Sequence, residues 1–223
     1  MVSDMRDNII STIEKEKLVV IVRGVEKKKL IPLADAMYKG GIRLLEVTYS
    51  ANGKITDEET AECIKILSEN FKERMYIGAG TVLTEEQVQL TYEAGGKFII
   101  SPDTNEKVIA KTRELDLVSM PGALTSSEVQ KAHVSGADFV KLFPVSNLGA
   151  DYVKAVRAPL SHIKFLAVGG ITMDNMADYL KAGVCGFGIG SNIVDKNLVD
   201  TNDYDAITAL AEKYVNIVKG IGK

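Results

Sequence analysis

The sequence predicts an α/β fold: a (β/α)8 TIM barrel with an extra N-terminal helix, built as a single domain from residues 1–223. Short apolar runs alternate with longer amphipathic stretches, which is typical of parallel strands joined by crossover helices. Glycines recur directly after the amphipathic stretches, where a residue with positive φ commonly ends a helix. Strand–helix units of roughly 20 to 28 residues then fit about eight times into the chain, which is the size of such a barrel.

Eight apolar runs are the expected strands. They are short and bounded by Gly, Pro or polar residues, as strands buried on both faces are. In chain order they are Leu18–Val22, Leu44–Val47, Met75–Ile77, Phe98–Ile100, Leu117–Met120, Phe139–Leu142, Phe165–Val168 and Gly186–Ile189.

The amphipathic stretches between these runs are the expected helices. Clear helical spacing covers Lys28–Lys39, Asp57–Phe71, Glu85–Ala94 and Ser126–Val134. The glycines that follow helices are Gly40, Gly41, Gly95, Gly96, Gly136 and Gly183. Asp4–Lys15 is an additional helix before the first strand, and we expect it to cover the bottom of the barrel.

An open, doubly wound sheet is the competing architecture. Its dinucleotide-binding form carries the pattern G-x-G-x-x-G after the first strand. Here Arg23-Gly24-Val25-Glu26 follows that strand. The glycine-rich segments Gly78-Ala79-Gly80 and Gly186–Gly190 do not complete the pattern either, so the barrel is favoured.

Composition and charge exclude several classes of protein. With 27 Lys and Arg against 30 Asp and Glu the net charge is -3, whereas nucleic-acid binders usually carry a basic excess. No apolar run approaches the ~20 residues that span a bilayer, and Met1–Lys17 contains no apolar stretch of the signal-peptide kind. Two cysteines and two histidines, without ligand spacing, favour neither a disulfide framework nor a metal site. We therefore expect a cytoplasmic protein without a metal.

Three charged side chains interrupt apolar strands close to their carboxyl ends. Arg23 ends the first strand, Glu46 lies within the second, and Lys141 lies within the sixth. Burying a charge is costly unless it is paired or functional, and barrel active sites lie at the carboxyl ends of the strands. We expect these residues to converge on one site. The alternative is structural: Arg23 capping the rim, and Glu46 and Lys141 forming an ion pair.

The surroundings of Lys141 favour a nucleophilic amine. Its neighbours Val140 and Leu142 desolvate it. Arg23 presents a like charge, and both effects lower the pKa of Lys141. Pairing with Glu46 would act in the opposite direction, so the sign of the net shift stays open. A neutral lysine attacks a carbonyl carbon to form a Schiff base, and a desolvated carboxyl such as Glu46 can carry the protons that this step needs.

Glycine-rich turns follow the seventh and eighth strands, where barrels of this kind commonly bind phosphate. Gly169, Gly170 and Gly190 let the backbone approach an anion closely. Ser191 adds a hydroxyl and can begin a short helix whose amino end favours an anion. The alternative is that these glycines only form tight turns between strand and helix.

Seven motifs occur in a fixed order: Glu46-Val47-Thr48, Gly78-Ala79-Gly80-Thr81-Val82, Ser101-Pro102, Met120-Pro121-Gly122, Lys141-Leu142-Phe143-Pro144, Val168-Gly169-Gly170 and Gly190-Ser191. Together they resemble the 2-dehydro-3-deoxy-phosphogluconate aldolase family, the class I pyruvate aldolases that include a galactonate-specific branch. The resemblance extends from about Val19 to Ser191, which is most of the chain.

This resemblance implies roles for individual residues. Lys141 corresponds to the Schiff-base lysine and Glu46 to the general acid/base. The implied phosphate-binding residues are Gly169, Gly170, Gly190 and Ser191. The implied contacts around the pyruvyl part of the substrate are Thr81, Pro102 and Phe143. Members of the family are typically homotrimers and need no metal, and we expect a homotrimer without a cofactor here.

Two positions depart from the common pattern of the family. Many members carry a carboxylate-binding arginine shortly after the Glu-Val-Thr strand, where this chain has Tyr49-Ser50-Ala51. Other members place an arginine at the end of the first strand, so Arg23 becomes the carboxylate-binding candidate, since a guanidinium and a carboxylate form paired hydrogen bonds. Val168 stands where phosphogluconate-type members usually have threonine. This resembles the galactonate branch and indicates a preference for the galacto epimer or tolerance of both.

The expected reaction is reversible cleavage of 2-dehydro-3-deoxy-6-phosphogluconate, or of its galactonate epimer, to pyruvate and D-glyceraldehyde 3-phosphate, with 4-hydroxy-2-oxoglutarate as a further substrate. The partner is thus a small phosphorylated 2-keto-3-deoxy sugar acid, with no nucleic acid and no membrane. Two alternatives stay open: another phosphate-binding barrel enzyme, such as an epimerase or decarboxylase, and a non-catalytic sugar-phosphate-binding barrel. Against the first, Asp138-Phe139-Val140-Lys141 lacks the later aspartate of an Asp-x-Lys-x-x-Asp array.

Overall fold

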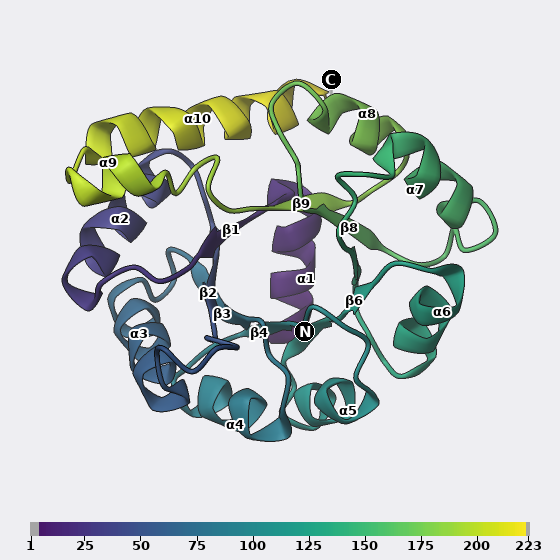
Figure 1. Cartoon of the computed structure of the whole chain (residues 1–223), viewed down its shortest axis with the longest axis horizontal. Helices are drawn as coiled ribbons and strands as arrows, with labels where there is room; N and C mark the ends of the chain where they lie inside the picture. The colour runs from purple at the N-terminus through teal and green to yellow at the C-terminus, as the bar shows by residue number, and fades with distance from the viewer. Residues whose placement is uncertain (1–4, 222–223) are drawn as a thin grey trace.

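The computed structural model describes residues 5–221, in which nine parallel strands form one sheet. Their order is β5-β4-β3-β2-β1-β9-β8-β7-β6, and Figure 1 shows them as a ring surrounded by helices. The strands are β1 (Leu18–Val22), β2 (Leu44–Thr48), β3 (Tyr76–Gly80), β4 (Phe98–Ile100), β5 (Val118–Met120), β6 (Gly122–Ala123), β7 (Val140–Leu142), β8 (Phe165–Val168) and β9 (Gly186–Ile189).

The ring closes through Pro121, the single residue between β5 and β6. Proline has no backbone N–H and therefore interrupts a strand ladder. The chain nevertheless continues alongside β7, because the Lys141 amide donates to the Pro121 carbonyl oxygen at 2.9 Å. β5 and β6 together thus form the fifth of eight barrel strands, and the predicted barrel with its eight apolar strands is confirmed.

Helices connect the strands around the outside of the ring (Figure 1). Within residues 5–221 the helices are α1 (Met5–Glu16), which precedes β1 and is not part of the outer ring, and α2 (Lys27–Lys39), α3 (Asp57–Asn70), α4 (Glu85–Glu93), α5 (Glu106–Glu114), α6 (Ser126–Val134), α7 (Gly149–Arg157), α8 (Met176–Lys181), α9 (Lys196–Asp200) and α10 (Tyr204–Ile221).

Local signals explain where several helices begin and end. Thr56 and Thr125 each form a capping box with a glutamate three residues later, which satisfies backbone N–H groups at the starts of α3 and α6. The four helices predicted from spacing occur within one residue of their expected bounds. The residues with positive φ that follow helices, as predicted, are Gly41, Gly95, Gly136 and Gly183.

Buried apolar residues form two clusters, because consecutive residues of a strand face opposite sides of the sheet. The outer cluster lies between the strands and the surrounding helices and includes Val20 and Leu45. The inner cluster lies inside the ring and includes Val19 and Leu44, the neighbours of those residues along the chain. A strand residue therefore points into the barrel when its neighbours belong to the outer cluster.

Helix α1 closes the inner cluster at the end where the strands begin. Its Ile9 and Ile13 are 1% exposed and pack into that cluster, and Figure 1 shows α1 across the centre of the ring. Arg6 of α1 forms an ion pair with Asp138, just before β7. The predicted extra helix over the bottom of the barrel is confirmed from Met5 onward, whereas its predicted first residue, Asp4, lies outside the described residues.

Three further features concern membrane spans, disulfide bonds and metal sites, which the composition did not favour. None of the helices in residues 5–221 combines the length and apolar character needed to cross a membrane. Cys63 and Cys185 are free thiols. His133 and His162 contact each other with ring centroids 4.9 Å apart, but no three His, Cys, Asp or Glu side chains in the described part of the chain gather as metal ligands would.

Candidate active site

Lys141 lies on the inner face of β7. Val140 and Leu142 on either side of it belong to the outer cluster, so the lysine points into the barrel. The residue is only 7% exposed, and its Nζ lies 4.7 Å from the centre of the Phe143 ring. Its long side chain therefore ends among barrel residues rather than in solvent.

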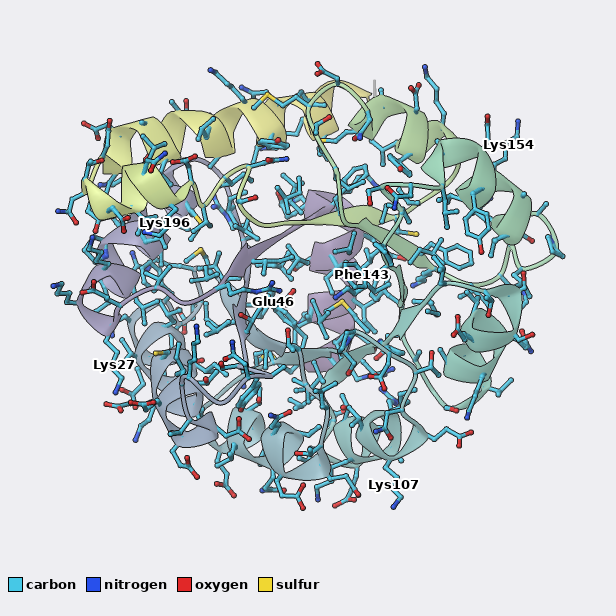
Figure 2. All side chains as sticks on the ribbon, viewed as in Figure 1. Lys27, Glu46, Lys107, Phe143, Lys154 and Lys196 are labelled. Carbon is cyan, nitrogen blue, oxygen red and sulfur yellow. The ribbon has the colours of Figure 1, made fainter. Side chains whose placement is uncertain are left out.

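Other lysines of the chain lie in a different environment. Figure 2 shows Glu46 and Phe143 over the centre of the ring, whereas the labelled lysines project from the surrounding helices. Those exposed lysines are Lys27, Lys107, Lys154 and Lys196. Burial thus distinguishes Lys141 from these ordinary surface lysines.

Glu46 occupies the corresponding inward position on β2. Leu45 and Val47 belong to the outer cluster, and Glu46 between them is 2% exposed. Its side chain lies against Gly80 of β3, where an added Cβ would fall 1.5 Å from Oε1 and 2.6 Å from Cγ of the glutamate. Gly80 therefore leaves the space that the carboxyl group occupies.

Burial dominates the titration of both buried groups. Burial raises the pKa of Glu46, and the positive charges of Lys141 and Arg23 partly oppose the rise. Burial lowers the pKa of Lys141, Glu46 opposes this effect, and the like charge of Arg23 adds to it. The sign that the sequence left open is thus decided by desolvation. Both shifts favour the neutral forms, an amine and a carboxylic acid inside one barrel.

Arg23 follows β1 and is exposed at the mouth of the barrel. In the β1–β2 register Val22 lies opposite Val47, so one further residue brings Arg23 level with Thr48. Its charge acts on both Glu46 and Lys141, as the pKa shifts of those groups show. Arg23 is therefore close enough to influence the titration of the two other charged residues singled out in the sequence.

A cavity of about 650 Å³ opens at the carboxyl ends of β1, β8 and β9. Ile21, Gly188 and Asn192 contribute to its wall. The predicted site residues that line it are Arg23, Phe143, Val168, Gly169, Gly170, Gly190 and Ser191. Lys141 lies next to this cavity, because its Nζ contacts the Phe143 ring.

Thr81 and Pro102 follow β3 and β4, on another arc of the ring, and do not line this cavity. Thr81 has a φ of 56° and directly follows Gly80, the residue beside the Glu46 carboxyl. The carbonyl oxygen of Pro102 packs against Gly122, where an added Cβ would fall 2.3 Å away. The structure thus places Thr81 directly after the residue that contacts the Glu46 carboxyl, but leaves both Thr81 and Pro102 outside the cavity wall.

The glycine turns at the cavity have the backbone freedom that the sequence suggested. Gly169 and Gly170 have φ values of 93° and 71°, a region that favours glycine. At Gly190 the nearest atom to an added Cβ is Ile21 Cβ, at 3.8 Å, so the space above this turn is open. The predicted helix at Ser191 is wrong: the Val194 amide donates to the Gly190 carbonyl oxygen in a single turn, and the next helix, α9, begins later.

Two asparagines that sequence reasoning missed brace these turns. Asn175 Nδ2 donates to the Gly170 carbonyl oxygen at 2.8 Å, and Asn192 Nδ2 donates to the Ile171 carbonyl oxygen at 2.7 Å. Asn192 follows β9 and Ile171 follows β8, so this bond joins the two turns. The adjacency of Asn192 to the Gly190-Ser191 motif was the only signal in the sequence.

The family model for KDPG and KHG aldolase matches residues 9–210. The chain belongs to this aldolase family. It is 31% identical over 215 residues to 2-dehydro-3-deoxy-phosphogluconate aldolase of Haemophilus influenzae, an alignment that covers 95% of this chain and 97% of the relative. The predicted resemblance is confirmed, and the enzyme is an aldolase, a lyase that acts on carbon–carbon bonds.

Solved structures related to this aldolase have the same barrel. One, described as native KDPGal, is 28% identical, with a TM-score of 0.83 over 92% of this chain and 95% of that chain. Another is a KDPG aldolase from Legionella pneumophila with pyruvate captured as a covalent carbinolamine intermediate. It is 27% identical, with a TM-score of 0.82 over 91% of this chain and 96% of that chain.

Proposed function

We propose that this aldolase reversibly cleaves a 2-dehydro-3-deoxy-6-phospho sugar acid to pyruvate and D-glyceraldehyde 3-phosphate through a Schiff base on Lys141. The observation that carries the proposal is the burial of the Lys141 amine inside the barrel. This burial lowers the pKa of the amine. A desolvated neutral lysine is a nucleophile for ketones. The L. pneumophila relative that holds pyruvate as a carbinolamine supports the same chemistry.

Lys141 and Glu46 divide the covalent and proton-transfer steps. The lysine nitrogen adds to the C2 ketone, and the Glu46 carboxylic acid protonates the resulting hydroxyl, which leaves as water to give an iminium. The Glu46 carboxylate then takes the proton of the C4 hydroxyl while the C3–C4 electron pair moves into the iminium. The aldehyde departs, the enamine takes a proton at C3, and hydrolysis releases pyruvate and the free lysine.

The remaining residues hold the two ends of the substrate. Arg23 binds the C1 carboxylate with paired hydrogen bonds, which its position level with Thr48 at the mouth supports. The open turns after β8 and β9 support phosphate binding by Gly169, Gly170, Gly190 and Ser191. The residues assigned to the pyruvyl part are Thr81, Pro102 and Phe143.

Val168 bears on which configuration at C4 of the substrate the enzyme accepts. It lines the cavity and has no hydroxyl to donate to a C4 substituent. We propose a preference for the galactonate epimer or activity on both epimers, with 4-hydroxy-2-oxoglutarate as a shorter substrate. Side-by-side cleavage of the two phosphorylated epimers, with pyruvate release followed by a coupled assay, tests this. Exclusive use of the gluconate epimer would contradict it.

The family resemblance also supports a homotrimer located in the cytoplasm and formed from single-domain chains. The mass of the enzyme in solution, measured by light scattering, tests the trimer. A monomeric mass in the active enzyme would refute this assembly.

Reductive trapping tests the mechanism directly. Borohydride added with pyruvate should leave one reduced pyruvyl group on the peptide that carries Lys141, located by mass spectrometry. Lys141→Ala should lose this adduct, and its turnover should fall by about 10³-fold or more because the iminium formed on Lys141 is the electron sink of the reaction. Lys107→Ala, which alters an exposed lysine of α5, is the matched control and should keep both adduct and turnover.

The same experiment separates the rival functions. Normal turnover in Lys141→Ala would refute the Schiff-base mechanism and favour another phosphate-binding barrel enzyme. Absence of both adduct and turnover in the wild-type protein would favour a non-catalytic sugar-phosphate binder.

A further inference from the structure

Thr48 carries a buried hydroxyl that has no hydrogen-bond partner within residues 5–221. The residue ends β2 and is 6% exposed. Buried hydroxyls in native proteins are nearly always hydrogen-bonded, since an unpaired one loses its bonds with water and gains nothing. An exception of this kind calls for an explanation beyond packing.

Other buried threonines of the chain show what the usual arrangement is. Thr60 Oγ1 donates to the Thr56 carbonyl oxygen at 3.1 Å, and Thr112 Oγ1 donates to the Val108 carbonyl oxygen at 2.7 Å. Both lie on helices, where the carbonyl oxygen four residues earlier is within reach. Thr48 lies on a strand that pairs with β1 and β3 on its two sides, and its side chain points into the barrel, so a partner for the hydroxyl has to come from inside the barrel.

The position of Thr48 places this hydroxyl beside the Glu46 carboxyl. Thr48 lies two residues after Glu46, and Val47 between them faces the outer cluster, so both side chains point inward. The β2–β3 register sets Thr48 opposite Gly80, and the Glu46 carboxyl itself lies against Gly80. The carboxyl group has therefore reached up the strand to the level of the hydroxyl, where it fills the space that Gly80 leaves.

We propose that Thr48 Oγ1 hydrogen-bonds the substrate oxygen with which Glu46 exchanges its proton. The inference rests on the proposed function and adds a residue to its machinery. A substrate oxygen held at the Glu46 carboxyl is within reach of both side chains, because they end at the same level of the barrel. Thr48 is then a substrate-contacting group at the reacting oxygen, separate from the groups that bind the carboxylate and the phosphate.

The hydroxyl serves both proton transfers. When the C2 hydroxyl of the carbinolamine takes the proton of Glu46, its bond to carbon breaks, the electron pair stays with oxygen, and the Thr48 O–H donates to the departing water. When the C4 hydroxyl later gives its proton to Glu46, the Thr48 O–H donates to the oxygen that becomes the aldehyde carbonyl. In each step a neutral donor stabilises charge that develops on oxygen without competing for the proton.

The inference predicts opposite effects of Thr48→Val on activity and stability. Valine has the shape of threonine without the hydroxyl, so it removes an unpaired polar atom from a buried position, and Tm should rise by about 2 °C or more. The same change removes one hydrogen bond from the transition state, and kcat should fall by about 10- to 100-fold while KM changes little. Thr48→Ser restores the hydroxyl and should recover most of the lost kcat.

Thr112→Val is the matched control, because its hydroxyl is fully buried, partnered, and located in α5. It should lower Tm and leave kcat unchanged. Borohydride trapping with pyruvate is run on every variant, and the adduct should form more slowly in Thr48→Val than in the wild type, since loss of water from the carbinolamine is one of the assisted steps.

Each outcome decides the matter. A Thr48→Val enzyme with wild-type kcat, while the wild type forms the adduct, overturns the role of Thr48 and leaves the Schiff-base mechanism intact. A fall in Tm together with kcat, with no recovery by Thr48→Ser, assigns Thr48 a structural role and also overturns the inference. Failure of the wild type itself to form the adduct overturns the proposed function, on which the inference rests.

Discussion

Lys141, Glu46 and Arg23 show how the position of one side chain sets its chemistry. Lysine and glutamate are charged at neutral pH in water, yet burial inside the barrel lowers the pKa of Lys141 and raises the pKa of Glu46. Arg23 at the mouth acts on both groups: as a like charge it lowers the pKa of Lys141, and as an opposite charge it lowers the pKa of Glu46. One rim charge therefore favours the nucleophilic amine while it opposes the acid form of the carboxyl.

In the profile of the Schiff-base formation rate against pH, Arg23→Gln should consequently move the acid limb to higher pH. The neutral amine exists above the pKa of Lys141, and removal of a like charge raises that pKa, so a smaller fraction is reactive at a given pH. The rate of borohydride trapping with pyruvate, measured across pH, reports the shift. The variant should also need about tenfold more pyruvate for half-saturation, because its carboxylate loses a charged donor. Lys107→Gln is the control, and an unmoved limb in Arg23→Gln would contradict the argument.

At the scale of the element, the carboxyl ends of β8 and β9 form one wall from two separate turns. Gly169 and Gly170 supply the unusual backbone angles, and the space above Gly190 is open. The bond from Asn192 to the Ile171 carbonyl oxygen holds the two turns at a fixed separation. A cradle for an anion needs this rigidity, since backbone N–H groups bind well only when they already point to one place.

Asn192→Ala should therefore weaken binding of phosphorylated substrates. Loss of this partly buried hydrogen bond should raise KM for the phosphorylated sugar acid by about five- to tenfold, with little change in kcat. Trapping with pyruvate, which has no phosphate, should be unaffected. Asn70→Ala is a suitable control because it removes a similar amide hydrogen bond at the exposed end of α3. An equal loss with pyruvate and with the phosphorylated substrate would refute a phosphate-specific effect.

At the scale of the whole molecule, residues that stabilise the fold and residues of the candidate active site lie at different ends of the barrel. Residues near the strand starts, such as Leu44 and Phe139, pack with Ile9 and Ile13 of α1. Glu46 and Lys141 lie farther along their strands, toward the cavity. This arrangement agrees with the general division of such barrels, in which one end carries the core and the other end carries the reaction.

Ile13→Ala should accordingly destabilise the enzyme without changing its active site. Removing a fully buried isoleucine leaves a cavity and should lower the free energy of unfolding by about 2 to 5 kcal/mol. Urea denaturation measures this loss, and kcat at a temperature where the variant is folded should stay at the wild-type value. Ser11→Ala, an exposed position in α1, should change neither quantity. A large fall in kcat of the folded Ile13 variant would show that the two ends are coupled.

The positions of strands and helices were predictable because their signals are local. Apolar runs, capping threonines and glycines such as Gly95 act within a few residues, and each predicted strand and helix occurs within a few residues of its expected bounds. Pro121, in contrast, splits the fifth strand in two, since a missing N–H interrupts the ladder without stopping the chain from following its neighbour. The prediction of a helix beginning at Ser191 was wrong because a good capping residue starts a helix only if the next residues continue it.

The sequence by itself determined the barrel, the aldolase motifs, and the inward position of Glu46 and Lys141. The reason is that consecutive residues of a strand point to opposite faces of the sheet, so the order of residues decides which side chains point inward. Only the tertiary structure decided that Gly80 makes room for Glu46, that the Thr48 hydroxyl finds no partner among the described residues 5–221, and that Asn192 bridges two turns. These facts depend on distances between side chains from different strands and turns. Such distances follow from register and packing across the barrel, which no local pattern in the chain records.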